Sequence, residues 1–178
     1  MKKVLLLGIA FGFTLLSCEK KETLQKYFVE NSEKKEFIAF DLASDLFNTQ
    51  KMELSADEKK ALTSFKKANV IAFKVDSTNQ NQFETERNKV RDLLKDDTYQ
   101  ELIKVDQGKE GGAIYFVGDD EHIDEFVIFA NKKENGFAVV RILGDDMNPT
   151  DVMNIIRLMQ KGNLNLEQLK PLEALVKP

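Results

Sequence analysis

The single cysteine of the chain, Cys18, lies directly after an apolar stretch near the N-terminus. Two lysines precede this stretch, which runs from Val4 to Leu16, and charged residues follow the cysteine at 19–22. The stretch has the length of the hydrophobic region of a secretion signal, about 7–15 residues. It is too short for a transmembrane helix, which needs about 20 apolar residues. Residues 1–17 are therefore predicted to be a signal peptide.

The sequence Leu15-Leu16-Ser17-Cys18 resembles the lipobox of bacterial lipoproteins, in which an aliphatic, a variable and a small residue precede a cysteine. The resemblance implies that the Cys18 thiol is diacylated, that the chain is cut before Cys18 and that the new amino group is acylated. Stable anchoring needs more than one acyl chain, which this chemistry supplies. We expect Cys18 to be the lipidation site and 18–22 to form a tether. The alternative is an ordinary secretion signal with a chance cysteine at its cleavage site.

The only histidine, His122, lies among the acidic residues Asp119, Asp120, Glu121 and Asp124. A catalytic zinc ion usually takes several nitrogen or sulfur ligands, and none accompanies His122. The spacing of an EF-hand calcium loop is also absent. We interpret the cluster as a solvated turn and predict no metal site.

Other candidate chemistry is weak. Asp145 and Asp146 precede a helix, so we expect them to cap it and to interact favourably with its positive end. A catalytic carboxylate pair would need two acids that face each other across a cleft. The glycines of GKEGG, at 108–112, lack the P-loop pattern and are expected to form a hairpin loop. No G-x-S-x-G motif occurs. We therefore predict no catalytic residue and no cofactor. The phenylalanine-rich strands could line a lipid pocket, but core packing is the simpler explanation.

The composition limits the class of protein. The chain has 178 residues, of which 42% are hydrophobic and 31% charged, as in globular proteins. Its formal net charge is −4, and removal of the signal peptide takes away two lysines. An acidic protein lacks the basic face that binds nucleic acid, so we expect no nucleic-acid partner. One cysteine also excludes an internal disulfide.

Hydrophobic spacing predicts the elements of the first half. A serine at 55 and a glutamate at 58 have the capping-box spacing that begins a helix. The apolar stripe that follows extends through Phe65 and Ala68, so this helix is expected to reach about Asn69. Asn81 is expected to cap the next helix. The expected elements are helices over 23–32, over 55–69 and from 81, with strands over 36–42 and 70–75.

The second half is predicted to be a β-meander followed by a helix. Strands are expected at 99–105 and in the segments GGAIYFVGDD, DEFVIFANK and NGFAVVRIL. Asn135-Gly136 between two apolar runs indicates a hairpin, because both residues tolerate positive φ. Asn148 and Pro149 have the residue types that open a helix, and Gly162 the type that ends one. A leucine-containing tail follows at 163–178.

This order predicts the α+β class, with a largely antiparallel mixed sheet of five to six strands and amphipathic helices packed on it. We expect one α+β domain at 23–162.

The lipobox, the segment FIAFDLASDLF, the strand VIAFKV and the meander from Ala113 to the last helix together resemble one family. This is the domain of unknown function 4252 (DUF4252) family of small lipoproteins from Bacteroidetes-type bacteria. The resemblance covers about Glu36 to Gln160, and the tail after Gly162 has no place in the family pattern. It implies an α+β domain anchored in the cell envelope, in the outer membrane and facing the periplasm. It implies no known activity and transfers no catalytic residue.

We therefore expect a membrane-anchored lipoprotein that is a non-enzymatic binding or interaction module. Its partners would be the membrane, through the lipid on Cys18, and another envelope protein. Two alternatives stay open. One is a carrier or sensor of small apolar ligands, which would need a closed, phenylalanine-lined cavity of roughly 300 Å³ or more. The other is a divergent enzyme, which would need converging acids in a cleft.

Overall fold

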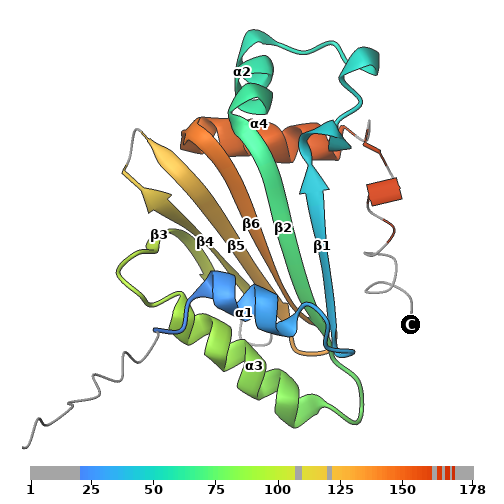
Figure 1. Cartoon of the computed structure of the whole chain (residues 1–178), viewed down its shortest axis with the longest axis vertical. Helices are drawn as coiled ribbons and strands as arrows, with labels where there is room; N and C mark the ends of the chain where they lie inside the picture. The colour runs from blue at the N-terminus through green and yellow to red at the C-terminus, as the bar shows by residue number, and fades with distance from the viewer. Residues whose placement is uncertain are drawn as a thin grey trace, which may run out of the picture.

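A computed structural model describes residues 21–106, 110–119, 122–161, 164, 165, 167, 168 and 170. Its centre is one open sheet of six strands (Figure 1). The strands are β1 (Phe37–Ala43), β2 (Phe65–Lys74), β3 (Gln100–Asp106), β4 (Glu110–Gly118), β5 (Ile123–Lys132) and β6 (Gly136–Met147). The helices are α1 (Leu24–Asn31), α2 (Ala56–Ser64), α3 (Gln80–Leu93) and α4 (Pro149–Gln160).

The strand order is β1-β2-β6-β5-β4-β3, and every neighbouring pair is antiparallel. The predicted α+β class and the meander that leads into the last helix are thus confirmed. The sheet is antiparallel rather than mixed, because each strand pairs with a neighbour that runs the other way.

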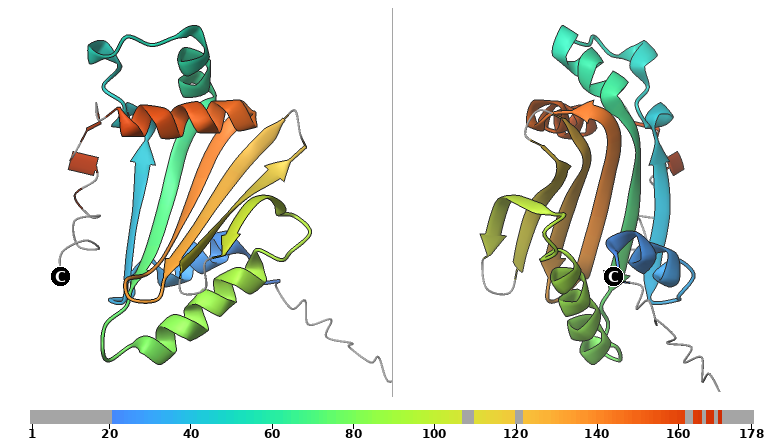
Figure 2. Two further views of the ribbon diagram at one scale, coloured as in Figure 1. Left: turned by 180° about the vertical axis from the view of Figure 1, so that it is seen from behind. Right: turned by 60° about the vertical axis from the view of Figure 1, so that its left-hand side comes forward.

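The helices cover the two faces of the sheet at opposite ends. Helices α1 and α3 lie over one face at one end of the strands, and α4 crosses the other face at the far end, beside α2 (Figures 1 and 2). We call these the α3 face and the α4 face. Seen from behind, the strands below α4 are not crossed by a helix (Figure 2, left).

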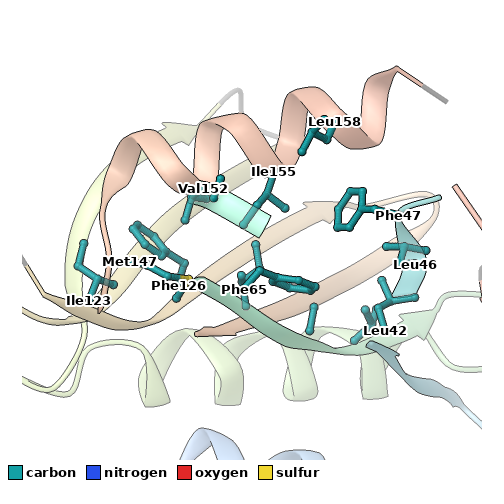
Figure 3. Packing of buried hydrophobic residues seen from close by; sticks show 14 of the residues in the cluster. Leu42, Leu46, Phe47, Phe65, Ile123, Phe126, Met147, Val152, Ile155 and Leu158 are labelled. Carbon is teal, nitrogen blue, oxygen red and sulfur yellow. The ribbon is translucent and has the colours of Figure 1, made fainter. Parts of the chain in front are cut away.

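Each face has its own hydrophobic core. On the α4 face, Val152, Ile155 and Leu158 of α4 point towards the sheet and the segment after β1 (Figure 3). A capping box between Asn148 and Asp151 begins this helix, as its sequence suggested. On the α3 face the core is aromatic, with Phe73 and Phe137 stacked at 5.7 Å between ring centroids. The other side chains of that core include Leu24, Tyr27, Phe37, Phe83, Val90, Val127 and Val139.

Two predicted helix boundaries are wrong. The capping box of Ser55 and Glu58 is present, but α2 ends at Ser64 instead of about Asn69. Phe65 and Ala68 belong to β2, where Ala68 pairs with both β1 and β6. Pairing on both sides of this strand outweighs the local helical pattern. Helix α3 begins after Asn79 rather than Asn81.

The hairpin between β5 and β6 differs in detail from the prediction. Lys132 pairs with Gly136, so three residues form the loop, and of the Asn-Gly pair only Gly136 has a positive φ, of 123°. The end of α4 predicted at Gly162 lies outside the described residues. In the tail, Leu164 forms a β-bridge with Phe47, and the Gln168 side chain accepts a hydrogen bond from the backbone of Ala43 at 3.2 Å. These tail residues therefore lie beside the end of β1.

Candidate functional site

The predicted lipidation site, Cys18, lies outside the described residues, but the tether that follows it begins within them. Lys21 contacts Asp96, directly after the α3 segment, and Glu22 pairs with Lys89 at 2.6 Å. The hydrogen bonds from Lys21 and Thr98 lower the pKa of Asp96 to about 2. These two ion pairs hold the end of the tether against α3. None of the described helices is long and apolar enough to cross a membrane.

The residues around His122 do not assemble into a metal centre in the described part of the chain. The two ring nitrogens lie 3.3 Å from Asp119 and 3.5 Å from Asp146, and all three side chains are exposed. Asp120 and Glu121 lie outside the described residues, and Asp124 is exposed on β5. Asp119 and His122 lie in a solvated turn between β4 and β5, as interpreted from the sequence, whereas Asp124 belongs to β5.

The sequence suggested that Asp145 and Asp146 cap the last helix, but the structure shows that they do not. Both lie at the end of β6, where Asp145 pairs with Lys66 at 2.5 Å. Asp146 has a φ of 54°, which aspartate tolerates better than most residues. The cap belongs instead to Asn148, because its amide oxygen accepts a hydrogen bond from the backbone of Asp151 at 3.0 Å.

The described part of the segment GKEGG is strand and not the expected hairpin loop. Glu110, Gly111 and Gly112 belong to β4, and the first two residues of the segment lie outside the described residues. A side chain at Gly112 would approach the backbone oxygen of Phe129 to 3.1 Å, and one at Gly111 that of Val105 to the same distance. The two glycines therefore allow β4 to pack closely between its neighbours.

A cleft of about 390 Å³ lies between α3 and the strands β3 and β4. Arg87 and Arg91 of α3 line it, together with Lys95, which follows α3, and Lys104 of β3. Two carboxylates share the lining, and the remaining surface is aromatic, aliphatic or backbone. The other residues that line the cleft are Leu94, Tyr99, Glu101, Val105, Asp106, Gly111, Gly112, Ala113, Tyr115, Phe129 and Asn131.

The cationic side chains of the cleft differ in their partners. Arg87 donates a hydrogen bond to Glu84 at 2.5 Å, and its guanidinium lies 5.3 Å from the ring centre of Phe83. Its Nε atom is buried and has no hydrogen-bond partner within the described chain. Lys95 pairs with Asp92 at 2.7 Å. Arg91 is exposed and forms no ion pair with any residue that the structure describes.

Two of the three tyrosines line the same cleft. Burial raises the pKa of the Tyr99 hydroxyl. Burial and then the nearby Glu101 raise the pKa of Tyr115, while the positive charges of Lys104 and Arg91 act in the opposite direction. Both phenols are therefore neutral at physiological pH and can donate a hydrogen bond. Sequence analysis missed this cleft, although Arg87 and Arg91 are spaced one helical turn apart in the predicted helix.

A second surface is the part of the α4 face that α4 leaves uncovered. Strand register places two apolar rows across the sheet here, side by side. Neither row contains a charged residue, and most of their side chains are half-buried or exposed. The first row is Phe40, Val70, Val140, Ile128, Ile114 and Ile103, and the second is Ile38, Ala72, Ala138, Ala130, Gly112 and Val105. We call this surface the open half-face.

The rows end at the edge strand β3, all of whose residues are exposed. Its side chains at Leu102, Ile103 and Val105 are 42–48% exposed, which is unusual for large aliphatic residues at a sheet edge. A register shift between Glu101 and Ile103 places the first of these at a bulge. The open half-face therefore continues to the margin of the sheet. Sequence analysis could not find it, because the rows depend on strand register.

Most of the described phenylalanines are buried in the two cores. Those on the α3 face contact one another, with ring centroids 5.2 Å apart for Phe37 and Phe73 and 6.3 Å apart for Phe83 and Phe137. They fill the core, as the simpler interpretation of the sequence expected.

Comparisons with known proteins identify the family. No curated protein and no solved structure matches the chain. The family model for DUF4252, a domain of unknown function, matches residues 27–155. This range contains β1 to β6 and most of α4, and it agrees with the family resemblance of the sequence. The chain therefore belongs to the DUF4252 family.

Proposed function

We propose that this protein is a membrane-anchored lipoprotein of the cell envelope that acts as a non-enzymatic binding module. Lipid on Cys18 would hold it in the outer membrane, facing the periplasm. The observation that carries the binding role is the open half-face, two apolar rows that no described helix covers. A partly exposed apolar surface that extends across every strand of a sheet is characteristic of an interaction site.

The dimensions of the open half-face fit one amphipathic helix of a partner protein. Rows on one face of a strand are two residues apart, or roughly 6.7 Å, so two rows span about the diameter of a helix, roughly 10–12 Å. Helix α4 already packs on the adjoining row of the same face through Val152, Ile155 and Leu158. A partner helix beside α4 would continue this layer. The small side chains of Ala138, Ala130 and Gly112 would allow its backbone to come close.

Anchoring would favour such an interaction. A lipid-held module and a partner in the same membrane meet at a raised effective concentration, so that modest contact area suffices. The competing role, transport of a small apolar ligand, gains no support from the phenylalanines, since they pack against each other in the core.

A photo-crosslinking experiment in the native type of host tests this proposal. A photoreactive amino acid replaces Ala130, which is exposed on the open half-face, in the full-length protein. The matched control replaces Val29, which is 72% exposed on α1. The intact mass of the membrane-extracted protein shows whether it begins at Cys18 and carries acyl chains.

We expect an adduct with one envelope protein from position 130 but not from position 29. The adduct should be lost when Ile128→Lys places a charge in the first row, and it should fall when Cys18→Ala releases the protein from the membrane. An adduct with the protein's own tail, or with a second copy, would show that this segment, and not a partner helix, covers the open half-face. Equal labelling from both positions would refute the binding role, and an unacylated soluble wild type would refute the anchor.

A further inference from the structure

The cleft between α3 and the strands β3 and β4 carries an inference that does not depend on the proposed interaction. We propose that this cleft binds a small amphipathic carboxylate, an organic acid whose charged group is attached to an aromatic or acyl body. Four cationic side chains and two carboxylates line the cleft, in a chain whose net charge is −4. The local excess of positive charge is therefore a property of this site and not of the whole protein.

The donors for the acid group lie on one face of α3. Arg91 has no ion-pair partner within the described residues, so its guanidinium can bind both oxygens of a carboxylate. Arg87 lies one helical turn away, and its buried Nε lacks a hydrogen-bond acceptor in the described chain. A buried donor without an acceptor is unfavourable, and an anion in the cleft could supply the missing acceptor. Lys95, two residues beyond the end of α3, adds a third positive charge to the lining.

The body of the ligand would rest on the inner wall of the cleft. Leu94 and Ala113 are 2% and 5% exposed, and Phe129 is 4% exposed, so this wall is apolar. The rings of Tyr99 and Tyr115 are partly buried beside it. Gly111, which also lines the cleft, has no side chain to fill it. The volume of about 390 Å³ is within the range of small-molecule pockets, roughly 300–1,000 Å³.

The arrangement favours a ligand that has both a negatively charged group and an apolar body. A purely apolar molecule would leave the arginines without partners, and a simple inorganic anion would leave the aromatic wall uncovered. An amphipathic carboxylate satisfies both at once, because the arginines and the apolar wall belong to one cleft.

Fluorescence of the tyrosines provides the test, since the chain has no tryptophan and two of its three tyrosines line the cleft. The full chain, in micelles of an uncharged detergent, is titrated with 2-naphthoate, whose ring accepts excitation energy from nearby tyrosines. The neutral analogue 2-naphthamide has the same shape without the charge. We expect naphthoate to bind at least tenfold more tightly than the amide, with a preference that weakens as salt is added.

The variant Arg91→Ala should weaken naphthoate binding about tenfold and leave naphthamide binding unchanged. Arg157→Ala is the matched control, because it removes an exposed arginine from α4 on the opposite face. Circular dichroism verifies that both variants keep the wild-type fold. Equal affinity for the two ligands, or an equal loss in the two variants, would overturn the proposal.

Discussion

At the scale of single residues, Arg141 and Glu125 form an ion pair whose two side chains are both nearly buried. Arg141 donates two hydrogen bonds to the Glu125 carboxylate, at 2.7 and 2.8 Å, and both side chains are nearly buried. The guanidinium also lies 5.6 Å from the centre of the Phe28 ring. Burial opposes the charged form of Arg141, but the bonded carboxylate outweighs it and raises the pKa of Arg141. This pair joins β5 to β6 beneath α1.

Removing one partner should be far more harmful than removing both. Arg141→Ala leaves the Glu125 carboxylate buried without its cation and should lower the free energy of unfolding by about 3–5 kcal/mol. The double variant Arg141→Met, Glu125→Leu should recover most of that loss, because neither charge remains. Urea denaturation followed by circular dichroism measures both. A double variant as unstable as the single one would show that the pair itself stabilises the fold.

At the scale of elements, the hairpin between β5 and β6 depends on Gly136. Its φ of 123° is unfavourable for any residue with a side chain, and an added Cβ would meet the backbone oxygen of Phe73 at 1.8 Å. Gly136→Ala should therefore destabilise the protein by roughly 1–3 kcal/mol from backbone strain alone. Lys133→Ala, an exposed change in the same loop, should stay within about 0.5 kcal/mol of wild type. Thermal unfolding of both variants tests this, and equal melting temperatures would contradict it.

The sequence predicted elements well where one local signal decides the outcome. Capping residues located the starts of α2 and α4, and alternation located the meander strands. The prediction failed at Phe65 and Ala68, where a helical spacing continued into a strand. Those residues belong to β2, which pairs with β1 and β6. Because β1 and β6 are distant from them in the sequence, no local pattern could reveal this pairing. The cleft and the open half-face depend on the same long-range pairing and were missed for the same reason.

At the scale of the whole molecule, one sheet separates two cores. All three tyrosines pack with the core of the α3 face, whereas Leu158 is buried in the core of the α4 face. Because β2, β5 and β6 contribute side chains to both cores, the two should unfold together. Leu158→Ala should lower stability by about 2–5 kcal/mol. The unfolding of this variant should still have the same midpoint by tyrosine fluorescence and by far-ultraviolet circular dichroism. Separated midpoints would show that the two cores unfold independently.

The ion pairs of Lys21 and Glu22 also limit the distance that could separate the folded domain from a lipid on Cys18. Cys18 and Lys21 are three residues apart, so their Cα atoms can be at most about 11 Å apart when the chain is fully extended. If Cys18 carries the lipid, this is the length of the tether. On so short a tether the domain could not move far from the membrane surface. Its α3 end would stay next to the bilayer while α2 and α4 point outward. Such a molecule would keep one orientation relative to the membrane, and its partners would reach it from one side.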